Sequence, residues 1–123
     1  MCHAAAYDPR MTHYLISFPG EAMQLSPEDF AAAGRDSRAV IKEMTEAGVL
    51  VFAGGINEDV GAALIDATGA ETAGGFDWAP TLDGGFTVIN VATRDEAVEW
   101  SRKIAVACKC SQELREFMAG SAP

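Results

Sequence analysis

Residues 73–91 hold the feature that most restricts how this chain can fold. Two Gly-Gly-Phe triplets, at residues 74–76 and 84–86, flank a short loop that contains Trp78 and Pro80. Glycine accepts the backbone angles of tight turns, and the run that follows the second triplet is rich in β-branched residues, which favour strands. The stretch therefore predicts a turn that leads into a strand over residues 86–92, the most regular strand in the chain.

Two helices are predicted from their first residues and their periodicity. Ser26 precedes a proline and two acids, which is typical of a helix start, and apolar residues at helical spacing from Phe30 onward predict a helix over residues 27–47. Thr93 and Glu96 have the spacing of a capping box, so a second helix is expected to start there and to bury Trp100 and further apolar residues on the same face.

The remaining elements follow from alternation and turn residues. Residues 12–18 alternate with Tyr14 and Ile16 on one face and His13 and Ser17 on the other, which predicts a strand. A short apolar run over 49–53 predicts a buried strand, 62–67 a weaker strand, 66–75 a turn region, and 108–118 a last strand. The predicted order is strand, helix, strand, hairpin insertion, strand, helix, strand, which defines an α+β fold.

This order predicts a homodimer. Right-handed crossovers place both helices on one face of the sheet, while residues 49–53 and 86–91 are apolar on both faces. A single chain would leave an apolar sheet face in water, and two sheets packed face to face would cover it.

Length, charge and cysteine content narrow the class of protein. The 123 residues fit one domain, expected over residues 11–120, with residues 1–10 as a flexible extension and 121–123 as a tail. A net charge of -9 argues against nucleic acid or an anionic membrane as a partner, and no apolar run approaches the roughly 18–20 residues of a membrane span. We expect a cytoplasmic protein.

The three cysteines, an odd number, predict reduced thiols. Cys108 and Cys110 would share one face of the last strand, but no second Cys or His pair completes a tetrahedral site. We therefore expect neither a metal nor a cofactor.

The chain from residue 11 to 120 resembles the YCII-related proteins, in particular the branch named for an Asp-Gly-Pro-Phe motif. The residues behind this resemblance are Thr-His-Tyr-Leu-Ile at 12–16, Leu-Ser-Pro-Glu at 25–28, Ala-Gly-Val-Leu at 47–50, Gly-Gly-Phe-Thr-Val-Ile-Asn-Val at 84–91, Asp-Glu-Ala-Val-Glu-Trp at 95–100 and Glu-Leu-Arg at 113–115. The resemblance implies a ferredoxin-like βαββαβ fold that forms a dimeric α+β barrel.

One position departs from that family pattern. Counting back from residues 84–86 puts Ala-Gly-Gly-Phe at 73–76, so Ala73 stands where the motif has its acid. Asp77 and Asp83 are the two nearby carboxylates for its role, and the sequence does not choose between them.

The resemblance also implies a site. A His paired with an acid is the suspected catalytic element of such proteins, which makes His13 the candidate acid or base, with Asp77 or Glu113 as its carboxylate. The expected pocket residues are Ser17, Trp78, Asn90, Glu113 and Arg115, with Trp78 either a lid over the barrel mouth or a dimer contact. Two functions stay open: acid-base chemistry on a small organic molecule, or a non-catalytic module for ligand binding or regulatory interaction.

Overall fold

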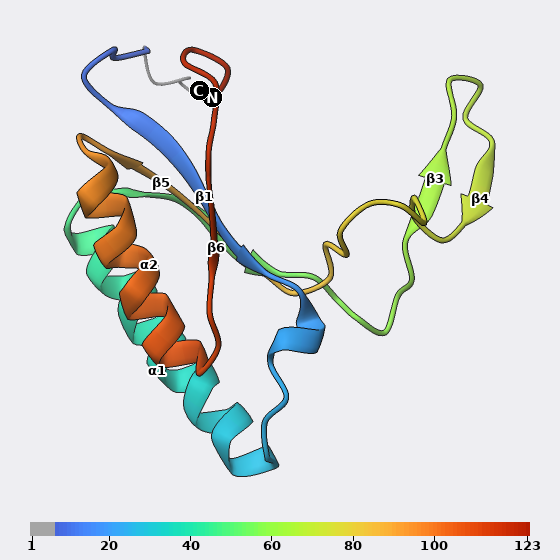
Figure 1. Ribbon diagram of the computed structural model, residues 1–123, viewed down its shortest axis with the longest axis horizontal. Coiled ribbons are helices and arrows are strands. Elements are labelled where there is room, and N and C mark those ends of the chain that lie inside the picture. The colour runs from blue at the N-terminus through green and yellow to red at the C-terminus, as the bar shows by residue number, and fades with distance from the viewer. Residues whose placement is uncertain (1–6) are drawn as a thin grey trace.

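The computed structural model describes residues 7–123 and has a mixed α+β architecture (Figure 1). Its elements, in chain order, are β1 (Thr12–Phe18), the 3-10 turn η1 (Gly20–Ala22), α1 (Pro27–Glu46), β2 (Leu50–Gly55), β3 (Ala63–Ile65), β4 (Glu71–Ala73), β5 (Gly85–Val91), α2 (Arg94–Cys108) and β6 (Glu113–Glu116). The predicted α+β class is confirmed.

Four of the strands form one antiparallel sheet in the order β2-β5-β1-β6. Both helices cover the same face of this sheet, and β6 returns along its edge (Figure 1). The register pairs Tyr14 with Ile89 and Ser17 with Phe86, so β1 and β5 are aligned over their whole length. The opposite face of the sheet is not covered by any described element, and it is called the open face below.

The core lies between the sheet and the two helices. Ile16, Met44, Ile89 and Val91 are among the most buried side chains, each with at most 1% of its surface exposed. They come from β1, α1 and β5, at positions that alternate along the strands and repeat with helical spacing on α1. Burial of these apolar groups is the main stabilising contribution to the fold.

Both helices begin where the sequence predicts, because their caps are local. The Ser26 hydroxyl accepts a hydrogen bond from the Asp29 amide at 3.1 Å, and the Thr93 hydroxyl accepts one from the Glu96 amide at 3.1 Å. Helix α1 ends at Glu46, one residue before the predicted end.

No helix among residues 7–123 has the length and apolar character needed to cross a membrane.

Strands β3 and β4 form a separate two-stranded hairpin, called the arm below, that projects away from the sheet and helices (Figure 1). Its turn is organised by Asp66, whose carboxylate accepts hydrogen bonds from the Thr68 amide at 2.8 Å and the Ala70 amide at 3.1 Å. The prediction of turn only over residues 66–75 is wrong, because β4 lies inside this range and pairs with β3.

Four further predictions need correction. The sequence predicts a buried strand over 49–53, but β2 lies at the edge of the sheet, and Val51 and Phe52 expose 48% and 59% of their surfaces. Helical spacing places Phe30 on the inner face of α1, yet 60% of its surface is exposed. The predicted last strand over 108–118 is confined to β6, since α2 continues to Cys108 and ends at Lys109 in the left-handed conformation, with φ of 57°. Cys108 and Cys110 therefore do not share a strand face.

The predicted extension over residues 1–10 lies in part outside the described residues, which begin at residue 7. Within the described part, Arg10 forms an ion pair with Asp8 at 3.0 Å and no regular element. Both side chains are near the surface, so this pair adds little to stability.

Candidate functional site

The open face of the sheet carries five of the residues expected at the site, but His13 and Ser17 stand four residues, or roughly 13 Å, apart along β1. His13 and Ser17 come from β1, Asn90 from β5, and Glu113 and Arg115 from β6. The register pairs His13 with Asn90 and Ser17 with Glu113. Direct cross-strand partners project from the same side of a sheet, and these positions alternate with the core residues, so all five lie on the open face.

Two oxygens on this face are buried without a hydrogen-bond partner among the described residues. They are Ser17 Oγ and Asn90 Oδ1, and Ser17 retains only 2% of its surface exposed. An unpaired buried polar group costs about 1–3 kcal/mol. The open face therefore holds polar atoms that a further partner would satisfy.

The same face is otherwise largely apolar. Phe52 on β2, with 59% of its surface exposed, stands in register beside Val88 of β5. Leu15 and Phe86 are partly exposed beside them. A continuous apolar surface of this kind marks a contact region in soluble proteins.

At the edge of the open face, Glu113 and Arg115 pair with each other. Arg115 donates to Glu113 Oε2 at 3.1 Å, and about half of each side chain is exposed. A pair this exposed contributes little to stability, and both groups remain accessible to a ligand or a partner.

His13 and Asp77 are not brought together within one chain. His13 pairs with Asn90 near the end of β5, whereas Asp77 lies in the loop before the first residue of β5, Gly85. Asn90 and Gly85 are five residues apart, which is roughly 16 Å along a strand. Within residues 7–123, His13 forms no ion pair with any carboxylate. The predicted acid-base pair is thus not assembled by a single chain.

Trp78 lies in the same loop as Asp77, with 82% of its surface exposed. Its ring stacks at a tilt on Phe76, with the ring centroids 5.1 Å apart. The two rings form an apolar projection beside the arm rather than a wall of the open face.

Of the two acids considered as substitutes for the missing motif acid, Asp83 has a structural role. Its Oδ1 accepts a hydrogen bond from the Gly20 amide at 2.8 Å, which ties the loop before β5 to the turn after β1. Asp83, with Glu58 and Asp59, also lines a shallow acidic cavity of about 380 Å³.

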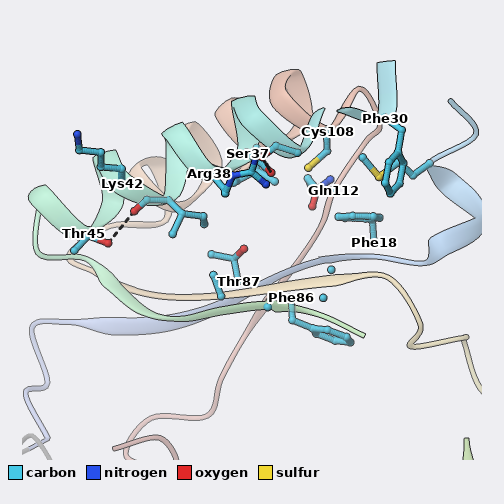
Figure 2. Close-up of a pocket in the computed structure, with 18 residues that line it drawn as sticks. Phe18, Phe30, Ser37, Arg38, Lys42, Thr45, Phe86, Thr87, Cys108 and Gln112 are labelled. Atoms are coloured by element: carbon cyan, nitrogen blue, oxygen red, sulfur yellow. Dashed lines mark hydrogen bonds between the residues drawn. The ribbon is translucent and has the colours of Figure 1, made fainter. Parts of the chain in front are cut away.

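Sequence reasoning missed a larger cavity on the other side of the sheet, between α1 and strands β2 and β5 (Figure 2). This helix-side cavity has a volume of about 650 Å³, within the range of ligand pockets. The signal in the sequence is a set of small residues at positions that face each other across the layers: Gly34, Ser37, Ala53, Gly55 and Gly85. That signal is visible only once the register between α1 and the strands is known.

The two described cysteines are free thiols at the far end of α2. Burial raises the pKa of Cys108 to about 11, and burial likewise raises the pKa of Cys110. Both thiols therefore stay protonated near neutral pH. Among residues 7–123 there is no group of three or more His, Cys, Asp or Glu side chains placed to hold a metal ion.

The chain matches no known protein-family model and no curated protein.

Proposed function

We propose that this protein is a homodimer that binds a small organic molecule, and that its two open sheet faces pack against each other. The observation that most supports the dimer is the open face itself, where Phe52 is 59% exposed and Ser17 Oγ and Asn90 Oδ1 are buried without partners. A second copy would cover the apolar side chains and bring polar groups to the unpaired oxygens. Interfaces of stable complexes bury about 800 Å² on each partner, a size that one face of a four-stranded sheet can supply.

We further propose that the fold is ferredoxin-like and forms a dimeric α+β barrel, as the resemblance to the YCII-related proteins implies. Apart from the arm, the elements follow the order βαββαβ, and the strand order β2-β5-β1-β6 is the one in which the first and third strands of that unit are central. Both helices on one face leave the other face free for the partner sheet.

The arm supports the same assembly. Phe76 and Trp78 expose 59% and 82% of their surfaces at the base of a hairpin that stands away from its own sheet. Exposed aromatic pairs are typical of contact surfaces, because they bury a large apolar area at little entropic cost. We therefore assign Trp78 to the dimer contact rather than to a lid.

Binding is the better supported function, and acid-base catalysis is the second candidate. Ala73 stands where the family motif has its acid, and His13 forms no ion pair with a carboxylate among residues 7–123. The second candidate is favoured by the position of His13 beside Asn90, whose unpaired Oδ1 could orient the imidazole once a partner chain supplies a carboxylate.

Light scattering after size-exclusion chromatography tests the dimer. The wild-type chain should elute with twice the mass of one chain, and Phe52→Glu should convert it to a monomer because a carboxylate would be buried in an apolar interface. Val106→Glu is the matched control, since Val106 is 67% exposed on α2 and away from the open face. A wild-type monomer at all concentrations, or equal effects of the two variants, would refute the assembly.

The ligand is tested by thermal shift against a panel of small carboxylic acids and phenols. A compound that binds at the open face should lose affinity in both His13→Ala and Glu113→Ala, whereas binding that survives both changes removes these residues from the site. Acid-base catalysis by this protein should vanish in His13→Ala.

A further inference from the structure

The helix-side cavity exists because small residues meet where a helix normally packs on a sheet. Ala53, Gly55 and Gly85 supply the sheet side, and Gly34 supplies the helix side. A Cβ added at Gly55 would meet no atom within 4 Å, so even there the space is open. The space has a volume of about 650 Å³, is partly open to solvent, and is of the size of ligand pockets.

The walls of the cavity are apolar. Apolar lining residues include Phe18, Met23, Ile41 and Ile104. Phe30, with 60% of its surface exposed, lies beside Phe18 at one end (Figure 2). Such walls favour an apolar ligand body, because moving apolar surface out of water is the main source of binding free energy in pockets of this kind.

The charged groups of the cavity are all positive. Arg38 and Lys42 line it from successive turns of α1, and none of its lining residues is Asp or Glu, although the chain has 18 acids against nine Lys and Arg. Within residues 7–123 the Arg38 guanidinium forms no ion pair or hydrogen bond, whereas the Lys42 amine lies 4.0 Å from Glu46. Figure 2 shows the Arg38 nitrogens beneath α1 and the Lys42 amine directed away from the cavity.

An unpaired hydroxyl points into the same space from the sheet. Thr87 retains 7% of its surface exposed, its oxygen is directed toward α1 in Figure 2, and it forms no hydrogen bond with a described residue. The thiol of Cys108 at the far wall stays protonated, because burial raises its pKa to about 11, so it adds no negative charge. The interior thus offers the free Thr87 hydroxyl, and no negatively charged side chain there repels an anion.

We propose that the helix-side cavity binds a monocarboxylic acid with an apolar body, its carboxylate held by Arg38 and a hydroxyl or keto oxygen of the ligand paired with Thr87. The planar guanidinium matches a carboxylate with two parallel hydrogen bonds, which gives direction as well as charge. One chain forms the whole cavity, so this site is separate from the open face and does not depend on the dimer.

Isothermal titration calorimetry with three eight-carbon probes tests the ligand class. Octanoate, octan-1-ol and octylammonium share the apolar chain and differ in the charge of the head group. Octanoate should bind at least about fivefold more tightly than octan-1-ol, and octylammonium most weakly, because the Arg38 guanidinium attracts only the anion. Octan-1-ol or octylammonium binding as tightly as octanoate would refute a carboxylate site.

Matched variants locate the site. Arg38→Gln should weaken octanoate binding by about tenfold, whereas Arg35→Gln, the same charge change on an exposed face of α1 outside the cavity, should change it by less than about twofold. Equal effects of the two variants would show that only the net charge matters, which would overturn the assignment of Arg38.

Filling the cavity supplies a second, independent test. Ala53→Leu should abolish octanoate binding while circular dichroism and the unfolding temperature report whether the fold is retained. Gly55→Val serves the same purpose if Ala53→Leu fails to fold. Octanoate binding that persists in a folded variant with a filled cavity would overturn the proposal. In the monomeric Phe52→Glu variant, by contrast, octanoate should still bind, which separates this site from the dimer interface.

Discussion

Gly84→Ala tests how closely β1 and β5 approach at the Gly-Gly-Phe triplet. A Cβ at Gly84 would overlap the carbonyl oxygen of Phe18 and lie 2.9 Å from the Gly20 amide nitrogen. Both neighbours are backbone atoms, so no side-chain rotation relieves the overlap. The strand end and the turn after it would have to move apart by more than about 1 Å to restore ordinary contact distances.

That movement disturbs a small set of identifiable interactions. It strains the hydrogen bond from the Gly20 amide to Asp83 Oδ1 at 2.8 Å and the end of the ladder where Phe18 pairs with Gly85. Loss of one or two hydrogen bonds at about 1 kcal/mol each, added to about 1–3 kcal/mol for overpacking, gives a destabilisation of roughly 3 kcal/mol. For a chain of this length that corresponds to a fall in unfolding temperature of roughly 10–15 °C.

Urea and thermal unfolding followed by circular dichroism measure this effect, with Gly55→Ala as the matched control. Gly55 is also a strand-end glycine, but a Cβ there meets no atom within 4 Å. Its replacement should be neutral or stabilise the protein by up to about 1 kcal/mol, since alanine lowers the entropy of the unfolded chain. If the two variants unfolded within about 0.5 kcal/mol of each other, the close approach at Gly84 would be refuted.

Four further outcomes are expected. Met44→Ala should lower the free energy of unfolding by about 2–5 kcal/mol because Met44 is fully buried, whereas Met118→Ala, at an 80% exposed site, should change it little in the same urea titration. Thr93→Ala should cost about 1 kcal/mol through the loss of the α2 cap, measured in the same way. In a variant whose other cysteines are serine, alkylation of Cys108 should be slow at neutral pH and accelerate toward pH 11. Hydrogen bonds from Thr68 lower the pKa of Asp66, so the arm turn should be protected from amide exchange above the ordinary aspartate pKa and lose that protection as the pH falls through the lowered value.

Local chemistry explains the parts of the fold that the sequence predicts well. Ser26 and Thr93 each satisfy an amide three residues ahead, so the starts of α1 and α2 depend on a few neighbouring residues. Strand β1 follows from alternation over seven residues, and its observed bounds are the predicted ones. The same alternation places His13 and Ser17 on one face, which is why several predicted site residues lie together.

Features that depend on distant parts of the chain were not predictable in this way. Helical spacing puts Phe30 on the inner face of α1, but 60% of its surface is exposed at the helix-side cavity, which α1 forms with residues of β2 and β5 distant in the chain. The end of α2 was missed for a local reason, because Lys109 adopts a left-handed conformation that is unusual for a residue other than glycine. Strand β4 spans three residues and is defined by its pairing with β3 rather than by its own pattern.

Charge distribution reconciles an acidic chain with a proposed site for an anion. A net charge of -9 repels anions at long range, but salt screens exposed charges beyond about 8–10 Å at physiological ionic strength. At the helix-side cavity the charged lining residues are Arg38 and Lys42, Arg38 is itself exposed to solvent, and no acid lines the walls. Long-range repulsion therefore disfavours extended polyanions such as nucleic acids, which must contact a broad surface. A ligand with a single carboxylate avoids most of this repulsion, because its charge contacts only the Arg38 guanidinium. A monocarboxylate is therefore the kind of anion that we propose for the helix-side cavity.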